Sequence, residues 1–96
     1  MLKDSPNEPF LLFAVAQEYT RLGSFEEALI NYKHLLSNSP GYTGTYYHMG
    51  KLYEQLGKKE DAMIIYKRGM EVTKDKGEDH AFSELKSALS MISDEK

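Results

Sequence analysis

Three histidines, His34, His48 and His80, are the side chains of this sequence best suited to binding a metal ion or transferring a proton. A helix presents two ligands to one ion when they lie three or four residues apart, as in the HExxH pattern, and no pair of these histidines has that spacing. We therefore expect three separate imidazoles on the surface or at the edge of a groove. The sequence predicts no metal site.

Other catalytic residue types show no catalytic arrangement either. The acidic pairs Glu26-Glu27 and Glu60-Asp61 each precede an apolar stretch, where negative charge stabilises the start of a helix. The glycines form neither a GxGxxG loop nor a P-loop, no serine stands in a GxSxG elbow, and cysteine is absent. The sequence thus predicts a protein that is not an enzyme and that binds no cofactor.

Length and charge limit the partners as well. The 96 residues suffice for one small domain with a core, but not for a deep, enclosed active site. Twelve Lys and Arg side chains interleaved with fifteen Asp and Glu give a net charge of −3, which argues against duplex nucleic acid as a partner. No apolar run approaches the roughly 20 residues of a membrane span, and the first residues lack a secretory signal. We expect a cytoplasmic protein that does not contact a membrane.

Two segments of the chain have nearly the same sequence. Residues 22–33 read LGSFEEALINYK and residues 56–67 read LGKKEDAMIIYK, so the period from Leu22 to Leu56 is 34 residues. A period of this length indicates an architecture of stacked repeats. The identical residues of the two copies are Tyr19 and Tyr53, Leu22 and Leu56, Gly23 and Gly57, Glu26 and Glu60, Ala28 and Ala62, Ile30 and Ile64, Tyr32 and Tyr66, and Lys33 and Lys67.

Each copy has the pattern of two amphipathic helices joined by a short turn. Apolar residues recur at helical spacing up to Gly23 and Gly57, and glycine can adopt the left-handed conformation that ends a helix. Ser24 and Glu27 have the spacing of a capping box for the next helix, whereas Lys58 in the second copy offers no such cap. The apolar stripes of the two first helices are Leu12, Val15, Ala16, Tyr19 and Leu22, and Tyr46, Met49, Gly50, Tyr53 and Leu56.

A fifth helix is predicted over residues 79–92, after Gly77 interrupts the second copy. Its apolar residues share one broad face, and its polar residues face outward, as expected of a helix that caps a stacked array. The apolar face consists of Ala81, Phe82, Leu85, Ala88, Leu89 and Ile92, and the outward positions are Ser83, Glu84, Lys86, Ser87 and Ser90.

The two copies resemble the tetratricopeptide repeat, whose 34-residue pattern is W-x2-L-G-x2-Y, then A-x3-F, then P. The second copy has Lys74 where the first has Pro40, so its last helix is expected to extend up to the GED sequence at residues 77–79. In the pattern's order, the first copy reads Leu12, Val15, Ala16, Tyr19, Ala28, Tyr32 and Pro40, and the second reads Tyr46, Met49, Gly50, Tyr53, Ala62, Tyr66 and Lys74.

The resemblance implies an all-α fold, an α-α superhelix of two helix hairpins and a capping helix with five helices in all. We predict a single domain over residues 1–96, with repeats at about 7–40 and 41–74 and the capping helix at about 79–93. It also implies a non-enzymatic scaffold for protein–protein interaction, which binds a peptide or a helix in a concave groove lined by the first helices. Aromatic side chains beside charged ones are typical of binding hot spots. The predicted groove residues are Phe10, Phe13, Gln17, Arg21, Tyr47, His48, Lys51 and Gln55.

Two alternatives to this groove remain at the level of the sequence. Phe10 and Phe13 could instead pack inside the monomer, and the same groove could join two copies in a homodimer. One subfamily grips the carboxyl end of chaperones through lysine and asparagine side chains. Phe13 stands in its lysine slot, and Gln17 and His48 stand in asparagine slots, so the resemblance does not extend to that clamp.

Overall fold

The computed structural model describes residues 8–93, and within this range the chain forms five α-helices and no strand. This confirms the predicted all-α fold. The chain divides into two compact units, residues 1–45 and 46–96, with the boundary in the first turn of α3. The ends of the predicted domain, residues 1–7 and 94–96, lie outside the described residues. The helices are α1 (Pro9–Arg21), α2 (Phe25–Asn38), α3 (Gly44–Gln55), α4 (Lys59–Lys76) and α5 (Asp79–Ser93).

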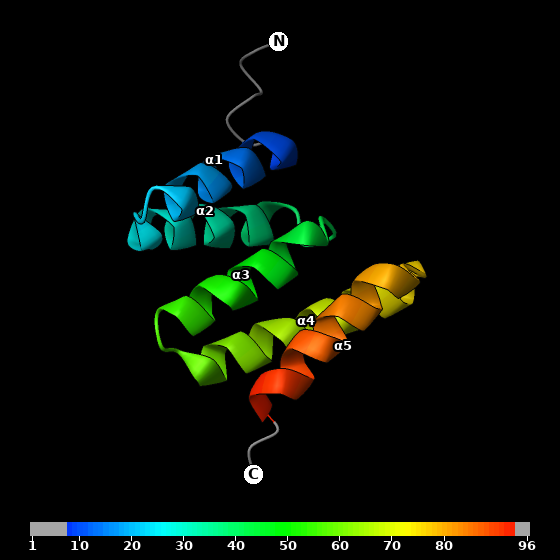
Figure 1. Cartoon of the computed structure of the whole chain (residues 1–96). Helices are drawn as coiled ribbons and strands as arrows, with labels where there is room; N and C mark the ends of the chain where they lie inside the picture. Colours follow the sequence, from blue (N-terminus) through cyan, green and yellow to red (C-terminus); the bar gives the residue numbers. More distant parts are fainter. Residues whose placement is uncertain (1–7, 94–96) are drawn as a thin grey trace. The chain divides into compact units, whose positions relative to one another are not determined.

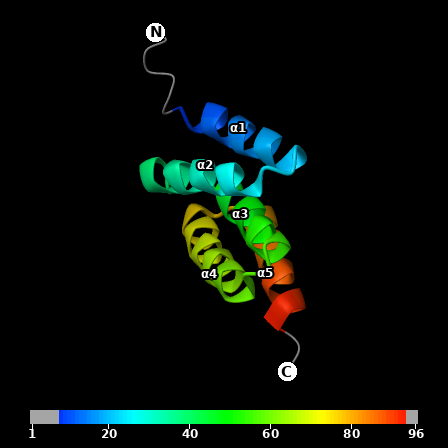
Figure 2. The same ribbon diagram turned by 90° about the vertical axis from the view of Figure 1, so that its left-hand side faces the viewer.

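The first unit is a hairpin in which α1 and α2 lie side by side and run in opposite directions (Figures 1 and 2). Pro9 stands in the first turn of α1, where its fixed φ angle favours a helix and its missing N–H costs nothing. Gly23 ends the helix with a φ of 82°, and the next backbone N–H, of Ser24, donates to the carbonyl of Tyr19 at 2.9 Å. The buried side chains include Leu12 and Ala16 of α1 and Ala28, Tyr32 and Leu35 of α2.

Two details of the first unit differ from the sequence prediction. Val15 and Leu22, predicted in the apolar stripe of α1, are 41% and 61% exposed. The Ser24 side chain makes no capping hydrogen bond, so the predicted capping box is wrong. Its ψ angle of 69° lies outside the extended backbone conformation from which a serine normally caps a helix. Glu26 and Glu27 in the first turn still stabilise the start of α2 through the helix dipole.

In the second unit α4 is the longest helix, and α5 returns antiparallel beside it (Figure 1). As predicted, α4 passes Lys74 and ends at Gly77, which has a φ of 72°. The backbone N–H of Glu78 then donates to the carbonyl of Thr73 at 2.9 Å. The buried side chains of this unit include Tyr46, Met49, Leu52 and Tyr53 of α3, Ala62, Ile65 and Tyr66 of α4, and Leu85 and Ala88 of α5.

Two glycines allow the helices of the second unit to approach closely. A Cβ atom placed on Gly50 would lie 2.2 Å from Cε1 of Tyr66, so the ring of Tyr66 packs directly on the backbone of α3. A Cβ atom on Gly69 would lie 2.5 Å from Cβ of Tyr46 and 2.9 Å from Cδ1 of Leu85. At Gly69, therefore, α4 contacts both α3 and α5 so closely that a Cβ atom would force the neighbouring helices to shift.

Over the described residues, none of the five helices combines the length and the apolar character that crossing a bilayer requires.

Candidate functional site

A hollow of about 270 Å³ lies between α3 and α5 in the second unit. Ala88 is buried at this place, whereas Met91 is 76% exposed, so the hollow has an apolar side chain free to contact a ligand. Two residues of α3 and six of α5 line it: Tyr47, Lys51, His80, Ser83, Glu84, Ser87, Ala88 and Met91.

Tyr47 is the aromatic residue of this hollow, and three neighbours hold its ring. The ring centroid lies 5.6 Å from that of His48 in an edge-on arrangement and 6.5 Å from that of Tyr66. The ammonium nitrogen of Lys51 lies 5.6 Å from the same centroid, close enough for a cation–π interaction. Tyr47 is half-buried, so a ligand meets a ring whose orientation is already set.

Glu54 forms a partly exposed ion pair with Lys51. The Lys51 ammonium lies 3.9 Å from Oε2 of Glu54, and the buried Tyr66 hydroxyl donates to the same oxygen at 2.5 Å. Burial, reinforced by the Glu54 carboxylate, raises the pKa of Tyr66, so this hydroxyl stays protonated and remains a donor. The cation of Lys51 thus lies between the ring of Tyr47 and the carboxylate of Glu54 and remains partly exposed.

His48 is half-buried next to this site. Burial lowers its pKa below the ordinary value of 6.5 because it disfavours the charged imidazolium, and the carboxylate of Glu84 on α5 opposes this effect only in part. On α5, His80 Nε2 lies 3.2 Å from Oε2 of the same glutamate, in an exposed pair. His48 is thus neutral at pH 7. It places an uncharged, polar aromatic ring against Tyr47.

We expect the stability of the protein to decrease as the pH is lowered, because of His48. The folded chain binds the His48 proton less readily than the unfolded chain, so the free energy of unfolding decreases as pH falls below the unfolded pKa of about 6.5. The decrease ends once the pH is below the folded pKa. NMR titration of the imidazole should give a midpoint below 6.5, and urea unfolding of the His48→Gln variant should lack this part of the pH dependence. A His48 midpoint above 6.5 would contradict the assignment.

The other predicted residues of α3 lie nearby. Gln55 is exposed and lines a separate shallow hollow of about 380 Å³ with Lys51 and Glu54. The structure therefore places Tyr47 and Lys51 in the lining of one hollow, with His48 in contact with the Tyr47 ring and Gln55 in a separate hollow.

On α1, in the first unit, the four predicted residues have unequal environments. Phe10 is 62% exposed, and Gln17 and Arg21 are also exposed. Arg21 pairs with Glu18, with its Nε atom 3.3 Å from Oε1. Phe13 is half-buried in an aromatic cluster, with ring centroids 6.2 Å from Tyr32 and 5.5 Å from Tyr42. Its ring is therefore largely engaged within the first unit.

Sequence reasoning missed the contribution of α5 to the hollow. His80, Glu84, Ser87 and Met91 follow one another at spacings of four, three and four residues, so they share one face of the helix. The sequence predicts that the polar positions of this helix face solvent. The signal in the sequence is Met91 at helical spacing from them, because an apolar residue on an otherwise polar helix face indicates a contact surface.

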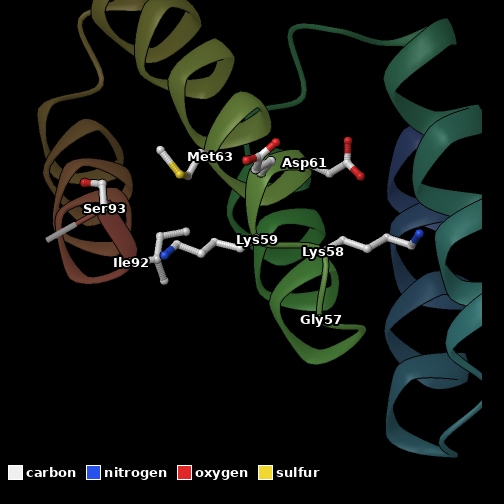
Figure 3. A pocket seen from close by; sticks show the side chains of 8 residues that line it. Gly57, Lys58, Lys59, Asp61, Met63, Ile92 and Ser93 are labelled. Carbon is white, nitrogen blue, oxygen red and sulfur yellow. The ribbon is translucent and has the colours of Figure 1, made fainter. Parts of the chain in front are cut away.

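A larger hollow, of about 530 Å³, lies between the start of α4 and the end of α5 (Figure 3). Figure 3 shows the side chain of Lys59 extending toward Ile92 while that of Lys58 points away. The lining of this larger hollow combines the two lysines with Glu60 and Asp61, and the side chains do not converge on one point. Among residues 8–93, no three His, Cys, Asp or Glu side chains are grouped so as to hold a metal ion. We therefore take the α3–α5 hollow as the candidate site.

The family model of the tetratricopeptide repeat matches residues 11–42 and 43–76. The chain belongs to the tetratricopeptide repeat family. This confirms the resemblance found in the sequence, and the family is in general a protein–protein interaction fold that is typically non-enzymatic. The predicted repeat boundaries and the assignment of residues 1–96 to one domain stay predictions.

Solved structures of a tetratricopeptide repeat domain protein from Salinibacter ruber are similar to this chain. Its solution NMR structure has 37% sequence identity and a TM-score of 0.90, covering 96% of this chain and 93% of that one. Its crystal structure has 37% identity and a TM-score of 0.87, covering 93% of this chain and 99% of that one. No match was found among curated proteins.

Proposed function

We propose that this tetratricopeptide repeat chain binds a peptide or a helix of another protein in the hollow between α3 and α5. The observation that supports this most is the pre-set ring of Tyr47, with the Lys51 cation beside it and the exposed Met91 across the hollow. Such a combination concentrates binding energy in few residues. We further propose that the chain acts in the cytoplasm as a scaffold and has no enzymatic activity.

The chemistry of the hollow indicates what part of a partner enters it. An apolar side chain placed against Tyr47 and Met91 would lose its contact with water, which contributes about 1.5 to 3 kcal/mol when burial is complete. An acidic residue next to that side chain would meet the Lys51 ammonium. On α3 we propose His48 and Gln55 as further contact residues, and on α1 of the first unit Phe10, Phe13, Gln17 and Arg21.

Replacing Met91 by serine is expected to weaken partner binding at least about tenfold, which corresponds to about 1.4 kcal/mol. Met91 is highly exposed, so the change removes apolar contact area without disturbing the core. Partners are first captured from a lysate with the wild-type chain and identified, and their dissociation constants are then measured by calorimetry. Lys51→Glu should weaken the same partners, and more strongly at low salt.

Ile64→Ser is the matched control, because Ile64 is 57% exposed on α4 and does not line this hollow. Equal binding by wild type, Met91→Ser and Lys51→Glu would exclude the hollow as the site. If instead the wild-type chain doubles its mass with concentration in sedimentation, and Met91→Ser stays monomeric, the hollow joins two copies. That result would replace the peptide proposal with the homodimer.

A further inference from the structure

Another hollow, of about 340 Å³, lies on α4 and α5 and shares no residue with the α3–α5 hollow. It is lined by Lys67, Met70, Glu71, Lys74 and Phe82. Met70 and Phe82 are both half-buried, so each presents part of an apolar side chain to solvent. Apolar side chains from two neighbouring helices offer a surface on which a third helix can pack.

Two exposed lysines border this apolar surface. Lys67 and Lys74 are seven residues apart on α4, so they lie on one face of the helix about 10.5 Å apart along its axis. Neither lysine forms an ion pair within the described part of the chain. Glu71 stands between them on the same face, so positive charge is found at the two ends of the stretch and negative charge in its middle.

We propose that this hollow is a docking site for an amphipathic helix of another protein that carries acidic residues seven positions apart. Those two residues would pair with Lys67 and Lys74, since two turns of the partner helix span the same distance of about 10.5 Å. Apolar residues at the third and fourth positions between them would cover Met70 and Phe82. Glu71 disfavours a third acidic residue in the middle, so the charge pattern selects an acid–apolar–acid stripe.

An extended segment fits this spacing less well. Its side chains on one face repeat about every 6.6 to 6.8 Å, so successive acidic positions would lie about 7 or 13 Å apart and miss one of the two lysines. A uniformly acidic segment would place charge over Met70 and Phe82 and against Glu71. The charges and the apolar surface together therefore favour a helix over either alternative.

Two synthetic peptides of about 15 residues, long enough to form four turns of helix, test this proposal. One carries glutamates seven residues apart with two leucines between them, and the other has lysines in place of the glutamates. In NMR titrations of the full chain, the glutamate peptide should shift the amide signals of residues 67–74 and of Phe82. The double variant Lys67→Glu, Lys74→Glu should bind it at least about tenfold more weakly and should instead bind the lysine peptide.

Lys51→Glu and Met91→Ser should leave this binding unchanged, which separates the test from that of the α3–α5 hollow. Equal binding of the two peptides, or no binding of either, would refute the proposal. Shifts confined to Tyr47 and Met91 would refute it too, because the peptide would then occupy the other hollow. A dimer of the wild-type chain that the double charge reversal dissociates would show that a second copy covers this surface, and would also overturn it.

Discussion

A chain that ends at Glu78, and so lacks α5, is expected to be less stable than the full chain by about 4 to 7.5 kcal/mol. Leu85 is fully buried and contributes about 1.5 to 3 kcal/mol, and the half-buried Phe82, Leu89 and Ile92 add about half as much each. Native domains are stable by only about 5 to 15 kcal/mol, so this loss is a large fraction of the total stability and equals all of it at the lower end of the range. Urea unfolding followed by far-UV circular dichroism measures the difference.

Point variants separate the packing of α5 from the length of the chain. Leu85→Ala should cost about 2 to 5 kcal/mol because it leaves a cavity against α4. Ser90→Ala, at an exposed position of the same helix, should change stability by less than about 0.5 kcal/mol. A shortened chain that unfolds at the same urea concentration as the full chain would show that α5 does not stabilise the fold.

The helices were predictable because their signals are local. The apolar period of about 3.6 residues marks each helix, and the glycines at 23, 57 and 77 end three of them with positive φ angles. The second repeat has Lys74 at the position of Pro40 in the first repeat, and the absence of a proline there correctly indicated that α4 continues past this residue. The Ser24 cap failed for a different reason. A capping hydrogen bond depends on the backbone angles of the single N-cap residue, and the residue type at that position does not determine these angles.

The candidate site was predictable only in part, and Phe13 and Tyr47 show why. They occupy the same position of the two repeats, yet Phe13 packs against Tyr42 whereas Tyr47 borders a hollow. Tyr42 lies in the turn after the first repeat, and its counterpart 34 residues on is Lys76, so the repeat pattern carries no information about this contact. The pattern likewise identifies the apolar face of α5 but not what its opposite face borders, which depends on tertiary packing.

The Gly69→Ala variant is expected to lose about 2 kcal/mol of stability, although alanine is the better helix former by about 1 kcal/mol. The new Cβ would lie 2.5 Å from Cβ of Tyr46, an atom fixed to the backbone of α3, and 2.9 Å from Cδ1 of Leu85. Rotating a side chain cannot relieve the first contact, so α3 and α4 must move apart. Overpacking of this kind costs about 3 kcal/mol, which exceeds the gain in helix propensity. Leucine, which the first repeat has here as Leu35, should be tolerated even less.

Gly44→Ala is the matched control for this variant. Gly44 is also a helical glycine, but a Cβ there would lie 3.6 Å from the ring of Phe13, an ordinary van der Waals distance. This variant should be as stable as the wild-type chain or slightly more stable, because only the propensity term changes. Urea unfolding of both variants tests the close approach of α3, α4 and α5. If Gly69→Ala were as stable as Gly44→Ala, the helices would not be held together as tightly as the contacts at Gly69 require.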